Sequence, residues 1–302
     1  MMREVCEMLG RRHAVPYVYA VEKRYAVCAK FVDTVFDPLY NPKISFADLS
    51  DPPKRQHDAE FFYREGGSLI DEFAEAYRMK DPVAVRQNVK NWVAHLKTRG
   101  LKQEAGKLAS VLPKLDEETT VEFGSDGAED VPRGIDSLNF PIVMQVFQFV
   151  EQNCPYPCDI IHDQTAAFEP IFLHFFRLFT QGVPRAIEMK DGRKMSFGFR
   201  NALSLTFADS KTEPIIRAAD YALAGTRRSI QLALAGDPIP LDITKIAFGT
   251  LGPILLGAYA LLHPSLEPMP TLSGYMASKW WTERVFGRLQ NEMRTTQNSG
   301  GW

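Results

Sequence analysis

Three aspartates occupy positions from which carboxylates could bind a metal ion. Asp163 follows the apolar run Ile160-Ile-His162, and Asp209 follows Leu205-Thr-Phe-Ala208. Asp220 lies further along the chain, among alanines. Mg²⁺ prefers oxygen ligands and is commonly held by one or two carboxylates. Two such ions about 4 Å apart can activate a water molecule and stabilise the leaving oxygen of a phosphodiester. The three aspartates therefore predict a metal-assisted active site, provided that their carboxylates lie close together in the folded chain.

Two strands and one helix must position these carboxylates. The spans 158–162 and 203–207 are short, rich in β-branched residues and read as strands, so Asp163 and Asp209 follow strand ends. Loops beyond the carboxyl ends of strands gather binding groups in open α/β sheets. The sequence Thr212-Glu-Pro214 is typical of a helix start, which predicts a helix from about 213 to 235 carrying Asp220.

Each aspartate also has a structural explanation. Asp209 could cap the helix that follows it, and Asp163 could cap a helix beginning at Thr165. Asp220 shares a helix face with Ile216 and Leu223. A carboxylate on such a face is costly to bury unless it is paired or binds a cation. Besides a metal ion, the partner could be one of the nearby arginines: Arg217, Arg227 or Arg228.

The rest of the chain alternates between strand and helix patterns. Residues 15–21 read as a strand, followed by a helix to about Phe36. The region 60–115 is helical in pattern, and 117–133 reads as an acidic loop. An Asp-Gly turn between 186–188 and 195–199 predicts a hairpin. Helices are further expected over 139–153, 166–180 and 273–295, the last with a basic bias. This alternation predicts an α/β fold with additional helices.

The segment Phe207-Ala-Asp-Ser-Lys-Thr-Glu-Pro-Ile-Ile-Arg-Ala-Ala-Asp220 resembles the closing motif of the bacterial family called domain of unknown function 3800 (DUF3800). There an Asp-Ser-Lys turn precedes a Gln-x-Ala-Asp helix. Ile160-Ile-His-Asp163 is similar to the family's preceding strand, and Val18-Tyr-Ala-Val-Glu-Lys23 to an earlier strand that ends in Lys. This chain lacks the family's opening Asp-Glu-Ser strand and has Arg217 where the family favours Gln. Either the natural start lies upstream of Met1, or part of the site is lost.

The resemblance implies a ribonuclease H-like fold, that is, a mixed sheet flanked by helices with carboxylates at its centre. On this basis we expect an α/β core over 1–235 with a helical insert at about 56–133, and a helical C-terminal extension over 236–302. The resemblance also implies that Asp163, Asp209 and Asp220 hold Mg²⁺, with Lys23 or Lys211 near the scissile phosphate.

Composition adds limits on partners and location. The net charge of −2 and the pI near 6.3 mean that a nucleic acid would have to be held by a local basic patch. The four cysteines have no zinc-site spacing and read as reduced thiols, so we expect a cytoplasmic protein. Ile246–Leu262 is uncharged but interrupted by glycines and Pro253, so it reads as a buried helical segment rather than a membrane span.

Two functions are compatible with the sequence. The first is a Mg²⁺-dependent nuclease, a hydrolase that cleaves phosphodiesters at the three-carboxylate site. The second is a non-catalytic binding or assembly module that keeps the ribonuclease H-like fold, with the aromatic helix at 168–179 and the C-terminal helices contacting a protein partner or a second copy. The chain has no Gly-x-Ser-x-Gly, Gly-x-Gly-x-x-Gly or phosphate-loop sequence that would favour another hydrolase.

Overall fold

The computed structural model describes residues 20–49, 51–123, 158–164, 185–188, 194–197, 203–239, 275–276 and 278–298, with scattered residues between 169 and 180. Residue contacts divide the chain into two compact units. The first, called here the discontinuous unit, comprises Met1–Val21, Gln145–Phe176 and Asn201–Trp302. The second, the helical unit, comprises Glu22–Met144 and Arg177–Arg200.

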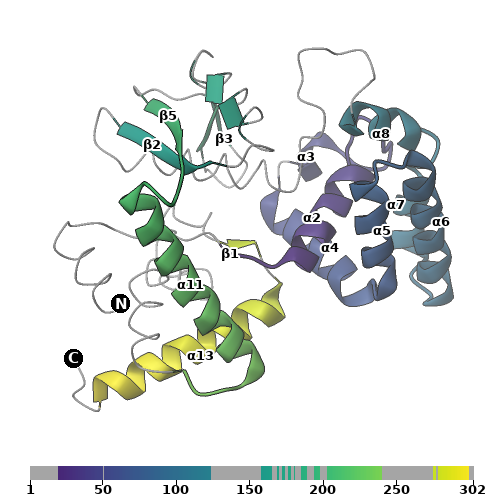
Figure 1. Ribbon diagram of the computed structural model, residues 1–302. Coiled ribbons are helices and arrows are strands. Elements are labelled where there is room, and N and C mark those ends of the chain that lie inside the picture. The colour runs from purple at the N-terminus through teal and green to yellow at the C-terminus, as the bar shows by residue number, and fades with distance from the viewer. Residues whose placement is uncertain are drawn as a thin grey trace. The chain divides into compact units, whose positions relative to one another are not determined.

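The helices of the helical unit follow one another along the chain (Figure 1). They are α2 (Lys23–Val35), α3 (Phe46–Leu49), α4 (Pro52–Glu65), α5 (Ser68–Arg78), α6 (Pro82–Thr98), α7 (Lys102–Ala109) and α8 (Leu115–Phe123). Their starts follow capping rules: Asp51 and Asp81 accept backbone N–H groups at the starts of α4 and α6, each with a proline in the first turn. The unit also contains the antiparallel pair β3 (Arg185–Glu188) and β4 (Lys194–Phe197).

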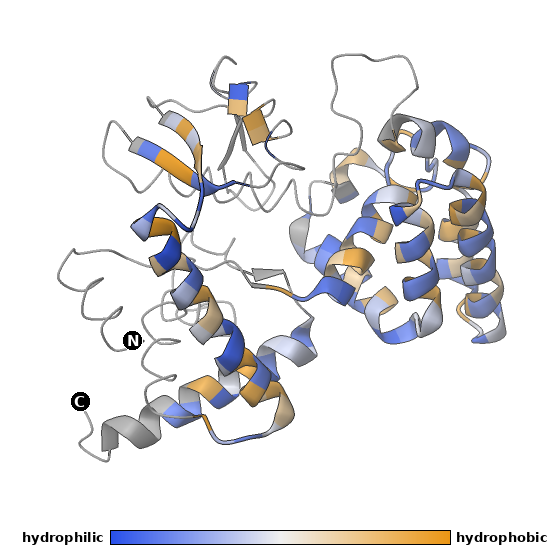
Figure 2. Ribbon diagram, in the orientation of Figure 1, coloured by the Kyte–Doolittle hydropathy of each residue, from blue (hydrophilic) through white to orange (hydrophobic). Residues whose placement is uncertain are grey.

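An aromatic cluster joins four of these helices. Phe31 of α2 lies edge-on to Phe62 of α4 and to Phe73 of α5, with ring centroids 4.9 Å apart in both pairs. Trp92 of α6 packs edge-on against Phe62 at 5.0 Å. All four side chains are buried, and edge-to-face aromatic pairs stabilise a core beyond the area that they bury. Apolar and hydrophilic residues alternate along each of these helices, as amphipathic packing requires (Figure 2).

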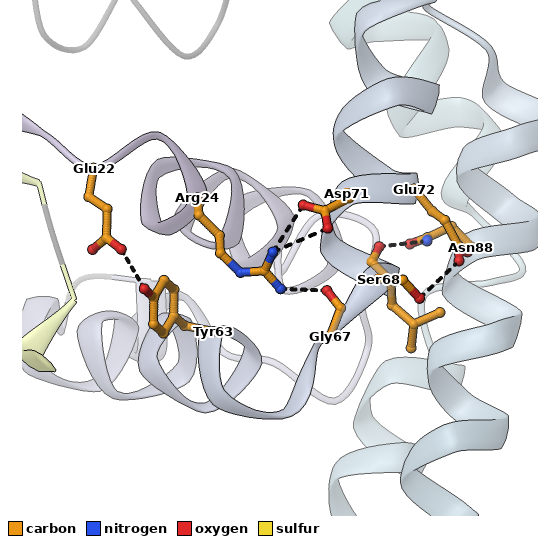
Figure 3. A network of polar contacts seen from close by, with 9 residues as sticks. Glu22, Arg24, Tyr63, Gly67, Ser68, Asp71, Glu72 and Asn88 are labelled. Carbon is orange, nitrogen blue, oxygen red and sulfur yellow. Dashed lines mark hydrogen bonds and ion pairs between the residues drawn. The ribbon is translucent and has the colours of Figure 1, made fainter. Parts of the chain in front are cut away.

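A polar network fixes the start of α2 against the turn between α4 and α5 (Figure 3). Arg24 donates to both carboxylate oxygens of Asp71, at 3.0 and 3.2 Å, and to the carbonyl of Gly67. Beside it, the Tyr63 hydroxyl donates to Glu22. Gly67 adopts φ +45°, a conformation that favours glycine. Arg24 thus bridges α2 to the first turn of α5.

The discontinuous unit contains β1 (Ala20–Val21), β2 (Cys158–Asp163), β5 (Leu203–Ala208), α11 (Pro214–Ala235), β6 (Tyr275–Met276) and α13 (Lys279–Asn298). β1 pairs with β6, and β2 pairs with β5, both in parallel. α13 packs against α11.

Two arginines of α13 attach it to the end of α11. Arg284 donates to the carbonyl of Leu234, and Arg288 donates to the carbonyls of Ala233, Gly236 and Asp237 at 2.8–3.3 Å. The last carbonyls of a helix have no partner within it and carry partial negative charge, so guanidinium groups are well suited to cap them. Two of the basic residues of the last helix therefore make contacts within the protein.

The predicted fold class is wrong. The described residues are mostly helical, and their strands form three separate two-stranded pairs rather than the mixed sheet flanked by helices expected of a ribonuclease H-like fold. The strands predicted at 158–162 and 203–207 are present, each one residue longer, and the hairpin strands pair as predicted. A local pattern does not specify which distant strands pair with each other. The predicted domain bounds, 1–235 and 236–302, stay a prediction.

Several predicted segments lie outside the described residues, namely 15–19, the whole of 124–157 with the predicted helix at 139–153, and Ile246–Leu262. None of the helices that the structure describes combines the length and the apolarity needed to cross a membrane.

Candidate functional site

Two of the predicted carboxylates lie at one edge of the β2–β5 pair. In the parallel register Asp163 lies opposite Ala208, so Asp209 is the next residue beyond that pairing. The backbone N–H of Gln164 donates to the carbonyl of Ala208 at 3.0 Å, which extends the pairing to this edge. The prediction that Asp163 stands at the carboxyl end of a strand is confirmed, and Asp209 directly follows the end of the neighbouring one.

The turn after β5 brings backbone donors to both carboxylates. Asp163 Oδ1 accepts the N–H of Ser210 at 3.3 Å, and Asp209 Oδ1 accepts the N–H of Lys211 at 2.8 Å. The carbonyl of Asp209 in turn accepts the N–H groups of Thr212 and Glu213. Asp209 is exposed and Asp163 is half-buried. The Asp-Ser-Lys turn therefore holds two acidic side chains at neighbouring strand ends, where a hard cation could reach them.

The start of α11 differs in detail from the expected one. The N-cap is Glu213, whose side chain accepts the N–H of Ile215 at 3.2 Å, and not Thr212. Pro214 occupies the first turn as predicted. Glu213, and not Asp209, therefore caps the start of α11. Asp209 instead accepts a backbone N–H group within the turn before the helix.

Asp220 is exposed on α11, so the expectation of a carboxylate in a buried apolar stripe is wrong for this residue. Of its expected face, Ile216 is buried, but the Leu223 side chain is 52% exposed. The buried stripe of the C-terminal half of α11 includes Leu232 and Ala233, but it also runs through small and polar residues that an apolar pattern does not reveal: Gly225, Thr226 and Ser229. Asp220 also forms no ion pair with an arginine among the described residues.

The two lysines have different positions. Lys211 is exposed in the turn beside Asp209. Lys23, expected at the end of a strand, is instead the first residue of α2, because the described strand there ends at Val21. Lys23 belongs to the helical unit and the carboxylates to the discontinuous one, so its role at the phosphate stays a prediction.

His162 packs as a structural side chain. Its ring lies 4.7 Å from that of Phe172 and 5.6 Å from that of Phe207, and its Nδ1 is 2.6 Å from the carbonyl of Asp163. Within the part of the chain that is described, no group of three or more His, Cys, Asp or Glu side chains has the arrangement of a metal site. The geometry thus places Asp163 and Asp209 at the ends of neighbouring strands, and the meeting of the three carboxylates at one metal ion stays a prediction.

Sequence reasoning missed the backbone donors of Ser210 and Lys211, although the Asx-turn tendency of an Asp-Ser-Lys sequence is a signal for them. It also missed a cavity of the helical unit that is lined by Lys43, Lys97 and Lys102. No local pattern marks that cavity, because its lysines are far apart in the sequence.

Comparisons with family models, with curated proteins and with solved structures find no match to this chain. The resemblance to the family called domain of unknown function 3800 therefore stays a prediction.

Proposed function

We propose that the chain is a Mg²⁺-dependent nuclease-like protein that hydrolyses phosphodiesters at Asp163 and Asp209. The observation that carries this proposal is the parallel register of β2 and β5, in which Asp209 stands one residue beyond the partner of Asp163. Carboxylates at neighbouring strand ends suit a hard cation that takes oxygen ligands. Asp163 and Asp209 would hold the ion, which would supply Lewis-acid chemistry, namely the activation of a water molecule and the stabilisation of charge on the phosphate.

The other residues have supporting roles in the proposed reaction. Asp220 is the third carboxylate that the family resemblance implies. Lys211, exposed in the Asp-Ser-Lys turn, would neutralise a phosphate oxygen next to the ion, and Lys23 is the second such cation implied by the resemblance. The backbone N–H groups of Ser210 and Lys211 hold the Asp163 and Asp209 side chains in place through their Oδ1 atoms.

The test combines metal binding with cleavage. Mn²⁺, which replaces Mg²⁺ in oxygen sites and is visible by electron paramagnetic resonance, is titrated into the full chain, and hydrolysis of single-stranded DNA and RNA is followed with either ion. We expect Asp163→Asn and Asp209→Asn each to weaken Mn²⁺ binding by more than about tenfold and to abolish cleavage, because each removes a charged ligand. Asparagine keeps an acceptor oxygen for the turn, so the fold is retained.

Asp159→Asn is the matched control. Asp159 lies on the same strand as Asp163, is exposed and accepts the hydroxyl of Ser204 across the pair, but it lies near the amino end of β2, away from the carboxyl ends of the two strands. It should leave metal affinity and cleavage unchanged. Equal loss in the control and in the two site variants contradicts the proposal, as does a wild-type chain that binds no Mn²⁺. Unchanged cleavage by Asp220→Asn rejects the role of that residue alone.

The exposed apolar side chains on α11 favour a second candidate, a non-catalytic binding or assembly module. Ile215 and Leu223 are 67% and 52% exposed, and exposed apolar residues that form a contiguous patch mark an interaction site. In that function the helix would contact a protein partner or a second copy. A wild-type chain without metal binding or cleavage would leave this candidate as the better one.

A further inference from the structure

A shallow cavity in the helical unit is lined by three lysines and small residues. It has a volume of about 600 Å³, within the usual range for small-molecule sites. Lys43, from the loop before α3, Lys97 near the end of α6 and Lys102 at the start of α7 surround it. Ala105, Gly106, Ala109 and Ser110 form the rest of the lining, with no acidic, amide or aromatic side chain.

Three lysine ammonium groups gather at this cavity without an acidic side chain that pairs with them in the described part of the chain. Many cations of the helical unit form ion pairs, among them Arg24–Asp71, Lys54–Asp48, Arg55–Asp33, Arg78–Glu75, Arg86–Asp116 and Arg99–Glu65. Within the described residues, none of Lys43, Lys97 and Lys102 does so. Three like charges around one cavity repel each other, and a bound anion would relieve that repulsion.

The wall of the cavity is held in place by a buried amide. Asn41 is fully buried, and its Nδ2 donates to the carbonyls of Val35 and Lys107 at 2.7 and 3.0 Å. Its Oδ1 accepts the backbone N–H of Lys43 at 3.1 Å and the hydroxyl of Ser110 at 2.6 Å. One side chain therefore ties the loop that carries Lys43 to α7, which carries Lys102. A site fixed in this way loses less conformational freedom when a ligand binds.

Gly106 keeps the floor of the cavity open. A Cβ atom at this position would lie 3.4 Å from the Nζ of Lys43, so the ammonium group extends directly over the glycine. Any larger side chain there would occupy space next to the charge.

We propose that this cavity binds a ligand carrying several phosphate groups, held by Lys43, Lys97 and Lys102. Lysine ammonium groups act as compact point charges and are common phosphate binders, whereas a carboxylate ligand is better matched by the planar fork of arginine. Because no aromatic or amide side chain lines the cavity, recognition is directed at the phosphates and not at a base. This site is separate from the carboxylate pair and does not depend on its function.

Isothermal titration of the full chain with sodium tripolyphosphate, in buffer containing EDTA, tests the proposal. EDTA removes divalent ions, so the carboxylate site cannot contribute. We expect one binding event per chain whose affinity falls as salt is raised from about 50 to about 300 mM, because exposed charges are screened. The triple variant Lys43→Gln, Lys97→Gln, Lys102→Gln should weaken binding by about tenfold or more.

The matched control removes three exposed lysines of the same unit that do not line the cavity, Lys80, Lys90 and Lys114. Its glutamine variant has the same net charge as the first triple variant and should bind tripolyphosphate within about twofold of the wild type. A separate variant, Gly106→Glu, keeps all lysines but adds a carboxylate beside Lys43, and should weaken binding about as much as the triple variant does.

Three results overturn the proposal. The first is equal weakening by both triple variants, which would show a general charge effect. The second is the absence of tripolyphosphate binding by the wild type. The third is binding of DNA or RNA oligomers that depends on Lys43, Lys97 and Lys102 without any binding of tripolyphosphate, which would assign the surface to a nucleic acid.

Discussion

Cys28 is a thiol enclosed within the helical unit. It lies on α2, has no exposed surface, and burial raises its pKa to about 12. Nearby Arg24 acts in the opposite direction and Glu22 in the same one, but burial is the largest cause. A thiol that stays protonated is a poor nucleophile and metal ligand, so Cys28 has a packing role.

The raised pKa of Cys28 should make stability fall at alkaline pH. Above pH 9.0, the ordinary value, the unfolded chain loses the thiol proton while the folded chain keeps it until about pH 12. The stabilisation is thus fully present below pH 9 and is lost as pH rises through this window, by about 1.4 kcal/mol per pH unit. Urea unfolding of the wild type and of Cys28→Ala, under reducing conditions at several pH values, measures the difference. A difference that stays constant with pH contradicts the assignment.

Asp163, Asp209 and Asp220 show how much of the site could be predicted. The positions of the first two followed from strand patterns that end directly before them, and such patterns are local. The exposure of Asp220 could not be predicted, because the buried face of a helix depends on the elements that pack against it, and α11 packs against α13. The buried residues of α11 include Gly225, Thr226 and Ser229, whose residue types carry no apolar signal.

At the scale of elements, two glycines with negative φ have opposite surroundings. Gly66 ends α4, and a Cβ atom there would lie 2.5 Å from Ile70 Cγ1, 2.6 Å from the carbonyl oxygen of Phe62 and 3.0 Å from Trp92 Cη2. Gly106 lies within α7, where a Cβ atom would meet only the flexible end of Lys43. The absence of a side chain at Gly66 therefore permits the close packing of α4, α5 and α6. At Gly106 no close packing of helices depends on the absence of a side chain.

The same substitution should therefore have opposite effects at the two positions. Gly66→Ala forces backbone and buried side chains apart and should lower the free energy of unfolding by about 1–3 kcal/mol. Gly106→Ala removes the conformational freedom of a helix-interior glycine and should raise it by about 0.5–1 kcal/mol. Chemical denaturation of both variants measures the two values. Destabilisation by both to the same extent would show that backbone conformation, and not space, decides.

The presence of the helices and strands was more predictable than their exact boundaries or their assembly. The helix expected over 273–295 is α13, but it begins at Lys279, since the buried Ser278 accepts the N–H of Trp281 at 3.2 Å and caps it. Tyr275 and Met276 instead form β6, paired with β1. A two-residue strand whose partner lies far away in the sequence leaves no periodic pattern. The sequence therefore did not show how the strands pair, and the predicted mixed sheet was wrong.

At the scale of the whole molecule, the helices from α2 to α8 are consecutive in sequence, and α2, α4, α5 and α6 share one aromatic core. Most of their contacts connect helices that are close along the chain, namely α2 with α4 and α5, α5 with α6, and α6 with α7 and α8, while α2 also contacts α8. Local contacts of this kind favour fast and independent folding.

We therefore expect the fragment 22–123 to fold when it is produced alone. Its far-ultraviolet circular dichroism should be helical, and its thermal unfolding should be a single cooperative transition. Phe31→Ala in the fragment should lower its stability by about 3–5 kcal/mol, because Phe31 contacts three buried aromatic rings. A fragment without a cooperative transition would show that residues outside this range are needed.

Because β1 pairs with β6, the two units can complete their contacts at different times during synthesis. Ala20 is paired with Tyr275, and at about 5–20 residues per second a ribosome needs roughly 10–50 s to advance from one to the other. The helices α2–α8 can complete their contacts within that interval, whereas β1 has to wait with its backbone hydrogen-bonding groups open to other partners. The period in which a nascent chain is most exposed to mispairing or to chaperone capture is therefore set by the discontinuous unit.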